Sequence, residues 1–273
     1  MLILIDDGFA TGRGTGIGNY TVELAKELSA PHYGVHVRLE THQQLQRIRP
    51  NALRRLVYWA WLNTGFQHHL RRVNPDVVHF TNFLVPTIRV SRSKIVTTLH
   101  DLSPWIASKT VSAWYRPYIR LATRLAVKYS DIIITVSDSV RQEINALWPE
   151  CGHKIIVIYN FVPKIFWTLP RNDRLTAWIV SKYELRHRYA LTVGSLSRRK
   201  NLATLLRAWR LVSERHDVEL VIVGPPGDAF RDVRGHLVQR NVRWLGYVPL
   251  DDLVRIYDGA SLLVFPSLYE GFG

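Results

Sequence analysis

Three consecutive cations in a glycine-led loop are the residues best suited to chemistry. The run Gly194-Ser-Leu-Ser-Arg198-Arg199-Lys200-Asn201 lies between an apolar stretch and an amphipathic one. An arginine fork and a lysine point charge suit the oxygens of a diphosphate. Cations at the start of a helix oppose its dipole unless an anion accompanies them. The loop therefore indicates a diphosphate site, and a solvated basic run is the alternative.

The sequence ends on a second glycine loop, which carries one carboxylate. Leu262-Leu-Val-Phe-Pro-Ser-Leu-Tyr-Glu-Gly-Phe-Gly273 reads as a short strand followed by a loop. Such loops bind anionic nucleotides when a helix follows them. Glu270 could accept hydrogen bonds from sugar hydroxyls or stabilise a developing cation, and a helix-capping carboxylate would look the same. Because no helix follows, we expect a fragment of a longer enzyme, cut within its binding site.

Glycines also follow the first apolar stretch, in Gly8-Phe-Ala-Thr-Gly12-Arg-Gly14-Thr-Gly16-Ile-Gly18. Glycines let a backbone approach a ligand closely, and a helix start offers free N–H groups to an anion. The dinucleotide pattern G-x-G-x-x-G fails at Ile17, although Glu40 could serve as its acidic partner. We predict a binding loop here, with a flexible turn as the alternative.

His100 and Asp101 close an apolar stretch that we expect to be a strand. The carboxyl end of a parallel strand is the ligand side of its sheet. His100 could hydrogen-bond a substrate hydroxyl or orient a reacting group. Alternatively, Asp101 or Ser103 caps a turn and His100 packs beneath it. The spacing does not choose between these interpretations.

The elements that must position these residues alternate between strand and helix, as in a mostly parallel sheet. We expect strands at Leu2–Asp6, Val35–Leu39, Val77–Phe80, Ile95–Leu99, Ile132–Val136, Ile155–Ile158, Ala190–Val193, Glu219–Val223, Val242–Leu245 and Ser261–Phe265. We expect helices at Gly18–Leu28, Leu53–Arg72, Ala113–Tyr129, Ser139–Leu147, Asn201–Val212 and Asp251–Asp258, with Ser139 to Gln142 as a capping box.

This alternation predicts an α/β protein with two Rossmann-like domains facing a cleft, the second incomplete. Residues 160–188 lose periodicity and contain Pro163 and Pro170. We therefore expect a first domain over 1–165, a linker over 166–188 and a second domain over 189–273.

Composition narrows the class of protein. An apolar fraction of 47% is typical of a globular protein. A single cysteine, Cys151, excludes a disulfide framework and suits a reducing compartment. No run reaches the roughly 20 apolar residues of a membrane span, and Met1 to Asp7 reads as a strand, not a signal peptide. The net charge is +14, and residues 1–180 hold 22 Lys and Arg against 12 Asp and Glu. Such a field attracts polyanions.

Basic and aromatic residues alternate over Gln43–Arg72. The segment contains Arg47, Arg49, Arg54, Arg55, Arg71 and Arg72 together with Tyr58, Trp59, Trp61 and Phe66. This pattern suits an amphipathic segment on anionic lipid. A helix that buries its aromatics in the core is an equal alternative. No recognised nucleic-acid module accompanies the segment, so we expect no nucleic-acid partner.

The order of these motifs resembles a known family. The motifs are the first glycine loop, His100-Asp101, Val136-Ser137, Tyr159-Asn160, Val193-Gly194 with Arg199-Lys200-Asn201, Val223-Gly224, Gly246-Tyr247-Val248 and Phe265 to Gly273. Together they resemble the retaining glycosyltransferases of family 4, with the GT-B fold, and most of all bacterial mannosyltransferases that build O-antigen or capsular polysaccharide. The resemblance runs the full chain, and its specific parts are the Arg-Lys-Asn loop and the terminal segment.

The resemblance implies a nucleotide-diphosphate sugar bound mainly by the second domain and an acceptor on the first. It implies His100 and Glu270 as catalytic residues, with Glu270 the first carboxylate of an E-x7-E motif. It implies donor binding by Gly16, Gly18, Gly194, Arg199, Lys200, Asn201, Gly271, Phe272 and Gly273. It implies no metal and no cofactor, since Arg199 and Lys200 take the place of a metal at the diphosphate. Retention of configuration in this family is usually assigned to attack by the acceptor on the front face of the sugar. That route needs no nucleophile from the enzyme.

The chain departs from the family pattern in three places. The second Glu of the motif would fall past Gly273. Ser195 stands where many members have Arg, and Asn160-Phe-Val-Pro163 stands where they have Asn-Gly-Val-Asp. The first departure predicts the loss of part of the nucleotide pocket.

We therefore predict a retaining hexosyltransferase that moves mannose from GDP-mannose to a polysaccharide or lipid-linked glycan. It would act in the cytoplasm, at the inner face of the membrane. The alternatives are an NAD(P)-dependent oxidoreductase and a noncatalytic nucleotide- or glycan-binding fragment. The sequence does not give the base, sugar, acceptor, linkage or oligomeric state.

Overall fold

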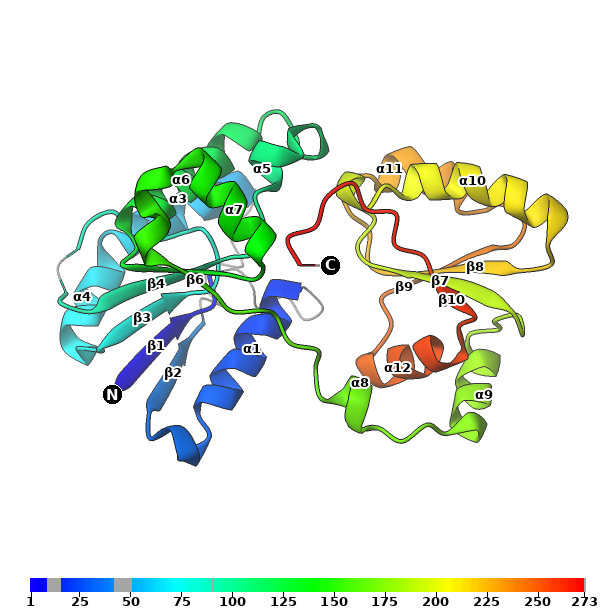
Figure 1. Ribbon diagram of the computed structural model, residues 1–273, viewed down its shortest axis with the longest axis horizontal. Coiled ribbons are helices and arrows are strands. Elements are labelled where there is room, and N and C mark those ends of the chain that lie inside the picture. The colour runs from blue at the N-terminus through cyan, green and yellow to red at the C-terminus, as the bar shows by residue number, and fades with distance from the viewer. Residues whose placement is uncertain (9–15, 42–50, 90, 273) are drawn as a thin grey trace. The chain divides into compact units, whose positions relative to one another are not determined.

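The computed structural model describes residues 1–8, 16–41, 51–89 and 91–272, which form two units (Figure 1). The first unit comprises Met1–Ser108, Ser112–Phe161 and Gly271–Gly273, and the second comprises Lys109–Val111 and Val162–Glu270. The division after Phe161 differs from the predicted domains 1–165 and 189–273. The predicted linker 166–188 lies within the second unit.

The first unit is built on a six-stranded parallel sheet. Its strands are β1 (Leu2–Asp6), β2 (His36–Glu40), β3 (Val77–Phe80), β4 (Lys94–Leu99), β5 (Ile132–Thr135) and β6 (Ile155–Val157). Their order is β2-β1-β3-β4-β5-β6, and Ile5 of β1 lies opposite Leu39 on one side and His79 on the other. The order reverses between β1 and β3. Ligands bind at such a switch point, beyond the carboxyl ends of the strands.

Helices pack on both faces of this sheet. They are α1 (Gly16–Leu28), α3 (Asn51–Leu62), α4 (Gly65–Val73), α5 (Ser103–Ile106), α6 (Arg116–Tyr129) and α7 (Asp138–Leu147), with 3₁₀ turns at Pro31–Tyr33, Ser108–Thr110 and Pro149–Lys154. Successive strand residues point to opposite faces. Leu4 accordingly joins the core built with α3, α4, α6 and α7, whereas Ile3 and Ile5 pack on Ala25 of α1.

The predicted helix Leu53–Arg72 is two helices, because Asn63 leaves the helical path. Its Oδ1 accepts hydrogen bonds from the backbone N–H groups of Thr87 (2.7 Å) and Ile88 (2.9 Å), a tertiary contact that periodicity does not reveal. The predicted helix Ala113–Tyr129 begins later, at Arg116. Pro117 lies in its first turn, where proline is tolerated.

The predicted capping box of α7 is displaced by two residues. Ser137, not Ser139, is the N-cap, and its Oγ accepts a hydrogen bond from the Val140 N–H at 3.2 Å.

The aromatic residues of Gln43–Arg72 do not form one exposed stripe. Tyr58 and Phe66 are fully buried in the first unit's core. Arg47 and Arg49 lie outside the described residues, and Arg71 and Arg72 are exposed at the end of α4. The alternative interpretation, in which the helix buries its aromatics in the core, is therefore correct for Tyr58 and Phe66.

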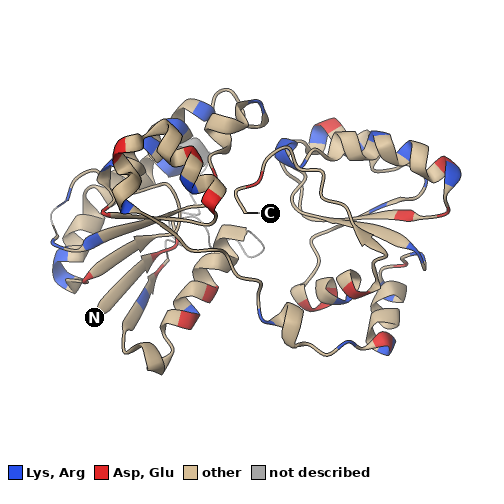
Figure 2. Ribbon diagram, in the orientation of Figure 1, with Lys and Arg blue, Asp and Glu red and all other residues tan. Residues whose placement is uncertain are grey.

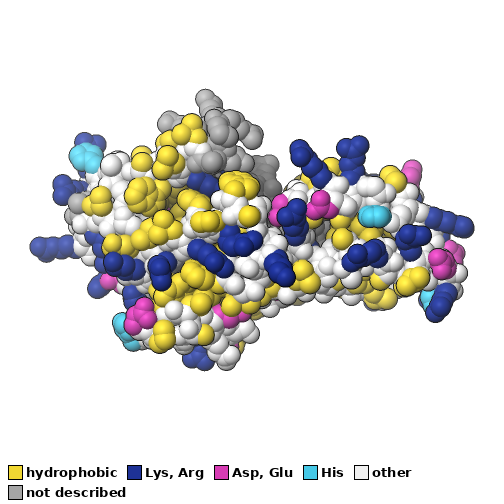
Figure 3. Space-filling view, turned by 90° about the horizontal axis from the view of Figure 1, so that it is seen from above, with side chains coloured by type: hydrophobic (Ala, Val, Ile, Leu, Met, Phe, Trp, Pro, Cys, Tyr) yellow, Lys and Arg dark blue, Asp and Glu magenta, His cyan; other side chains and the backbone are white. Residues whose placement is uncertain are grey.

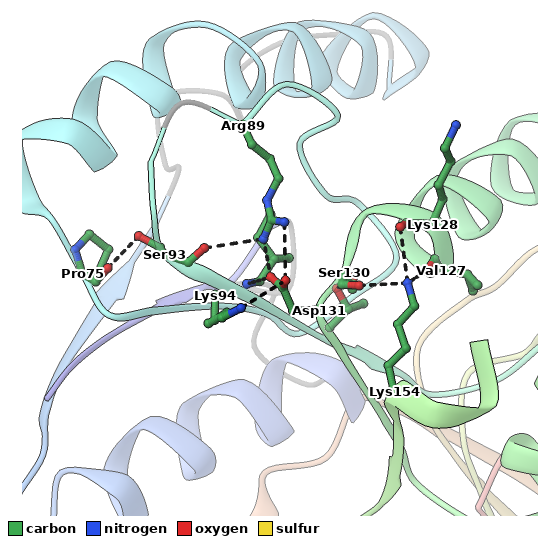
Figure 4. A network of polar contacts seen from close by, with 11 residues as sticks. Pro75, Arg89, Ser93, Lys94, Val127, Lys128, Ser130, Asp131 and Lys154 are labelled. Carbon is green, nitrogen blue, oxygen red and sulfur yellow. Dashed lines mark hydrogen bonds and ion pairs between the residues drawn. The ribbon is translucent and has the colours of Figure 1, made fainter. Parts of the chain in front are cut away.

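Charged residues tie the sheet together at the amino ends of β4 and β5 (Figure 4). Asp131, just before β5, accepts hydrogen bonds from the Arg89 guanidinium and the Ile95 N–H. Lys154 Nζ donates to two carbonyls at the end of α6, those of Val127 (3.0 Å) and of the C-cap Ser130 (3.1 Å). Cations stabilise such unpaired carbonyls at a helix end. These contacts at the amino ends of the strands have a structural role, since ligands bind beyond the carboxyl ends of parallel strands.

The second unit is built on a four-stranded parallel sheet, β10-β7-β8-β9. Its strands are β7 (Tyr189–Val193), β8 (Glu219–Val223), β9 (Val242–Gly246) and β10 (Leu262–Leu263). Its helices are α8 (Ile165–Thr168), α9 (Asp173–Lys182), α10 (Leu202–Arg215), α11 (Phe230–Val233) and α12 (Leu250–Gly259), with 3₁₀ turns at Arg198–Lys200 and Arg234–His236. Leu206 and Trp209 of α10 pack on one face, and α9 and α12 on the other.

Helix α9 corrects the expectation of an aperiodic linker. It begins at a polar cap, since Asn172 Oδ1 accepts a hydrogen bond from the Leu175 N–H at 2.9 Å. Ile179 is buried in the same core cluster as Ile256 of α12. The prolines at 163 and 170 both precede α9, so neither interrupts it.

Replacing Ile179 with alanine should lower the free energy of unfolding of the second unit by about 2–4 kcal/mol, because it opens a cavity in this core. Leu211 of α10 is 64% exposed, so Leu211→Ala is the matched control and should change it by less than about 0.5 kcal/mol. Urea unfolding of both variants measures the difference. Equal effects would contradict the packing of α9 in this core.

Candidate functional site

The basic loop begins at two glycines whose backbone no other residue adopts easily. Gly194 ends β7 with φ of 145°, and Gly224 ends β8 with φ of 149°. A Cβ on Gly224 would lie 2.0 Å from the carbonyl oxygen of Gly194. The two strand ends are therefore in backbone contact, and this contact sets the path of the loop that follows β7.

The loop then makes a 3₁₀ turn at Arg198–Lys200 and enters α10 through Asn201. Asn201 adopts a left-handed conformation (φ 54°), which asparagine tolerates better than most residues. Its N–H donates to the carbonyl of Arg198, and its Nδ2 donates to the carbonyl of Pro266 at 3.2 Å. Asn201 thus joins the basic loop to the segment after β10.

Glu270 lies between the two cations that the sequence singled out. Arg199 Nη1 donates to Glu270 Oε2 and, at 2.9 Å, to the carbonyl of Tyr269. Lys200 Nζ lies 2.8 Å from Glu270 Oε1. One carboxylate therefore supplies the anion that the cations need near the start of α10. A bound phosphate is not required to explain their position.

The space beside these cations is small. A cavity of about 10 Å³ is lined by Gly194, Ser195, Lys200, Phe265 and Ser267, among others. That volume suits about one water molecule. Lys200 Nζ also lies 4.4 Å from the centre of the Phe265 ring. A diphosphate would need more room than this arrangement leaves.

The carboxyl group of Glu270 has a pKa below its ordinary value. Burial raises this pKa, but hydrogen bonds from Lys200 and Ser267 and the charge of Arg199 outweigh that effect. Glu270 is therefore ionised at neutral pH and holds both cations electrostatically.

Arg198 belongs to a different contact. Its N–H donates to Asp228 Oδ1 at 3.1 Å, and its Nη2 lies 3.4 Å from Asp232 Oδ2. Of the three cations in the loop, Arg199 and Lys200 alone share Glu270 among the described residues.

His100 belongs to the first unit and follows β4. Its Nε2 donates to the carbonyl of Thr81 at 3.1 Å, so Nδ1 is the acceptor nitrogen of the neutral ring. The rings of Tyr20 and His100 pack in a T-shaped arrangement, with their centroids 4.9 Å apart. Burial lowers the pKa of His100 and keeps it neutral. Asp101 Oδ1 also accepts from the Ser103 N–H at 2.9 Å, so both interpretations of this segment are partly correct.

A buried polar network lies beneath His100. Thr98 Oγ1 is 3.2 Å from the hydroxyl of Tyr20 and 2.8 Å from His79 Nε2. Burial, and to a lesser degree the electrostatic interaction with neighbouring His100, lowers the pKa of His79 to about 4. The network joins α1 to β3 and β4, and so positions the Tyr20 ring against His100.

The glycines of the first loop are only partly described. Gly16 and Gly18 form the first turn of α1, and a Cβ on Gly16 would contact nothing within 4 Å. Gly12 and Gly14 lie outside the described residues. Glu40 pairs with Arg38 (2.5 Å) and His69 (3.1 Å), and is therefore not poised as the acidic residue of a dinucleotide site.

The terminal glycines are divided from Glu270. Gly271 is buried, Phe272 is exposed, and both are grouped with the first unit, whereas Glu270 belongs to the second. Gly273 lies outside the described residues. The roles of Gly16, Gly18, Gly194, Asn201, Gly271, Phe272 and Gly273 in donor binding stay predictions.

The sequence reasoning missed three contributors. Phe265 and Ser267 were named only within the terminal motif and Tyr20 was not singled out, although the first two contact Lys200 or Glu270 and the third contacts His100. The short spacing of Phe265 and Ser267 before Glu270 could have pointed to them. A loop that folds back over a neighbouring strand end brings such residues close to the carboxylate that the loop carries.

Across the described part of the chain, no helix combines the length and apolarity of a membrane span. In the same residues, His, Cys, Asp and Glu side chains form no group of three or more that could hold a metal ion.

Models of two families match the chain in succession. Residues 14–164 match Glycosyltransferase Family 4, and residues 187–273 match Glycosyl transferases group 1. The chain belongs to Glycosyltransferase Family 4. The chain is 32% identical to O-antigen chain mannosyltransferase B from Escherichia coli, over 75% of this chain. O-antigen chain mannosyltransferase RfbU from Salmonella typhimurium is 27% identical over 77% of it. The chain spans 54% and 60% of these two relatives.

Solved structures agree on the fold. The chain matches sucrose-phosphate synthase from Thermosynechococcus elongatus with a TM-score of 0.73, at 17% identity, over 100% of this chain and 77% of that one. It matches Anabaena HepE in complex with UDP-glucose with a TM-score of 0.69, at 18% identity, over 100% and 76% of the chains. The predicted GT-B fold is confirmed, and nothing supports the oxidoreductase alternative.

The ion pairs of Glu270 give a pH-dependent contribution to the stability of the second unit. Because the folded state lowers the pKa of this carboxyl, its contribution is present above the ordinary value of 4.5 and is lost as pH falls through the folded pKa. Glu270→Gln should therefore destabilise the unit by about 1 kcal/mol at pH 7, and by progressively less below pH 4.5.

Urea unfolding at a series of pH values measures this difference. Glu214→Gln, at an exposed position of α10, is the matched control and should show no such trend. A difference between Glu270→Gln and wild type that is the same at every pH would contradict the ion pairs.

Proposed function

We propose that this chain carries the donor-binding part of a retaining glycosyltransferase, which moves mannose from GDP-mannose to a polysaccharide or lipid-linked glycan. The observation that carries the proposal is the convergence of Arg199 and Lys200 on one carboxylate at the end of β7. The names of the two mannosyltransferase relatives support mannose as the sugar. The UDP-glucose complex of HepE supports the class of nucleotide-diphosphate sugars.

In this proposal the diphosphate of the donor replaces Glu270 as the anion between the cations. Arg199 offers a planar fork to two phosphate oxygens, and Lys200 offers a compact charge to a third. Glu270, released from both, is then a hydrogen-bond acceptor for the sugar or ribose hydroxyls. The exchange keeps the cations neutralised at every stage, and it opens the small cavity beside them.

The same cations would assist the chemical step. The bond between the anomeric carbon and the diphosphate oxygen breaks, and the acceptor hydroxyl oxygen bonds to that carbon on the same face. The hydroxyl proton passes to an oxygen of the leaving phosphate. Arg199 and Lys200 stabilise the negative charge that develops on the leaving group, the part that a metal ion plays elsewhere. His100, neutral with Nδ1 as acceptor, would receive a hydrogen bond from a sugar hydroxyl.

The acceptor and the location belong to the same proposal. A growing O-antigen or capsular glycan on a lipid carrier would be extended at the cytoplasmic face of the membrane. The net charge of +14 suits attachment to an anionic surface there.

Arg199→Ala and Lys200→Ala should each weaken GDP-mannose binding by roughly 10- to 150-fold, the equivalent of about 1.5–3 kcal/mol for a charge-assisted hydrogen bond. Arg210→Ala, exposed on α10, is the control and should bind like wild type. Isothermal titration with GDP-mannose, GDP and UDP-glucose measures these affinities and identifies the base.

Three outcomes would redirect the proposal. Unaltered nucleotide affinity in both variants contradicts a diphosphate site at these cations. Binding of NADH without binding of any nucleotide-diphosphate sugar favours the oxidoreductase. Donor binding without sugar transfer, in a protein of the full length of its relatives, favours a noncatalytic module.

A further inference from the structure

A chain of polar groups beneath α1 ends at His100. His79 Nε2 lies 2.8 Å from Thr98 Oγ1, which in turn lies 3.2 Å from the hydroxyl of Tyr20. The ring of Tyr20 packs on the ring of His100 in a T-shaped arrangement. The contacts therefore run from the interior of the sheet to the histidine that the proposed function places at the donor sugar.

The polar chain interrupts a mostly apolar face of the sheet. Ile5 of β1 packs on Ala25 of α1, and His79 pairs with Ile5 in the neighbouring strand, so both face α1. Thr98 lies two residues beyond Val96, the partner of His79 in β4, and therefore faces α1 as well. The sequence thus places a histidine and a threonine where aliphatic side chains would pack.

Stability alone does not account for these two residues. On the face visible in Figure 3, histidines (cyan) lie singly among other surface side chains. By contrast, His79 is only 5% exposed and Thr98 is fully buried. Burial of a polar group costs free energy unless it is hydrogen-bonded, and a bonded pair adds little over an apolar pair of the same shape. A role in fixing geometry is the remaining use of such a pair.

The start of α1 contributes hydrogen bonds here and no charge. The charged residues of α1 are Glu23, Lys26 and Glu27, and the beginning of this helix is tan in Figure 2. Hydrogen bonds between neutral groups are directional, since they weaken steeply away from a linear arrangement. Such contacts suit the placement of an aromatic ring.

Two neighbouring residues of α1 act on His100 from different sides. Tyr20 packs on the imidazole, and Phe161 stacks on Tyr20 with the ring centroids 6.4 Å apart. Thr21 Oγ1 lies 2.7 Å from Thr81 Oγ1, and the carbonyl of Thr81 accepts the hydrogen bond from His100 Nε2. The bond at Nε2 sets the tautomer and leaves Nδ1 as the acceptor nitrogen.

We propose that Tyr20 is a positioning residue which, anchored through Thr98 to His79, fixes the His100 ring so that Nδ1 accepts a hydrogen bond from a hydroxyl of the donor sugar. The inference rests on the proposed function for the sugar, and on the contacts of the first unit for the geometry. The hydroxyls of Tyr20 and Thr98 act through the orientation of His100 and do not touch the substrate. A small misplacement of a group that orients a substrate is enough to weaken its effect.

Variants of Thr98 separate the hydroxyl from the volume of the side chain. Thr98→Val keeps the shape and removes both hydrogen bonds, whereas Thr98→Ser keeps the hydroxyl and loses one methyl group. Thr97→Val is the matched control. Thr97 is equally buried on the same strand, but it faces the other side of the sheet, where its hydroxyl pairs with Ser130 at 2.7 Å.

Long-range proton–nitrogen NMR spectra of the imidazole rings report the tautomer of His100 without any substrate, and His100→Gln assigns the signals. Nε2 should carry the proton in wild type, in Thr98→Ser and in Thr97→Val. In Thr98→Val, and in Tyr20→Ala, the signals of His100 should show a mixture of both tautomers, because the ring is no longer held against the Thr81 carbonyl.

Isothermal titration with GDP-mannose and with GDP separates a contact to the sugar from a contact to the nucleotide. Thr98→Val should weaken GDP-mannose binding about three- to tenfold, the range of one hydrogen bond, and leave the affinity for GDP unchanged. Thr98→Ser and Thr97→Val should bind both ligands like wild type. Tyr20→Phe breaks the same link by removing a hydroxyl, and should show the same loss if Thr98→Val does not fold.

The outcomes are distinct. A His100 tautomer that is unchanged in both Thr98→Val and Tyr20→Ala overturns the proposal. An equal loss of GDP-mannose affinity in Thr98→Val and Thr97→Val also overturns it, and so does a loss that falls equally on GDP. A tautomer mixture as expected, in a chain that binds no nucleotide sugar, supports the positioning of His100 by Tyr20 and counts against the proposed function alone.

Discussion

The carboxylate of Glu270, held between Arg199 and Lys200, is the contact on which the candidate donor site depends. Two cations near the start of α10 repel each other and oppose the helix dipole. Glu270 removes both costs, and hydrogen bonds and charges from the cations lower the pKa of its carboxyl. A site arranged in this way is ready for an anion with more charge and more oxygens than one carboxylate has. A diphosphate is such an anion.

Backbone contacts bring the three side chains together. Gly194 and Gly224 let β7 and β8 end in direct contact, so the loop after β7 turns toward β10. Asn201 then links that loop to Pro266 by a side-chain hydrogen bond. A Cβ at Gly224 would push the loop away from the strand ends. The chemistry of the cations is thus set by glycine geometry several residues before them.

Much of this arrangement could be predicted from the sequence, because parallel strands are short apolar runs with sharp ends. The ranges Leu2–Asp6, Val77–Phe80 and Glu219–Val223 agree with the structure residue for residue. The pairing of strand ends with glycine loops also placed Arg199 and Lys200 at the end of β7. These features are local, and local patterns are readable.

The predictions that failed concern features that depend on tertiary contacts. The break after α3 arises because Asn63 binds the backbone near Thr87, 24 residues away in the sequence. Helix α9 was missed because the two prolines were taken as signs of a linker, although both precede a helix whose Ile179 is buried. The partnership of Glu270 with the cations joins residues about 70 apart, and no spacing rule could supply it.

A crystal structure of the protein with GDP tests the central claim most directly. The account predicts that the β-phosphate oxygens lie within hydrogen-bonding distance of both Arg199 and Lys200, and that the Glu270 carboxylate has moved off the two cations. GDP bound elsewhere, with Glu270 still paired to Arg199 and Lys200, would contradict the account.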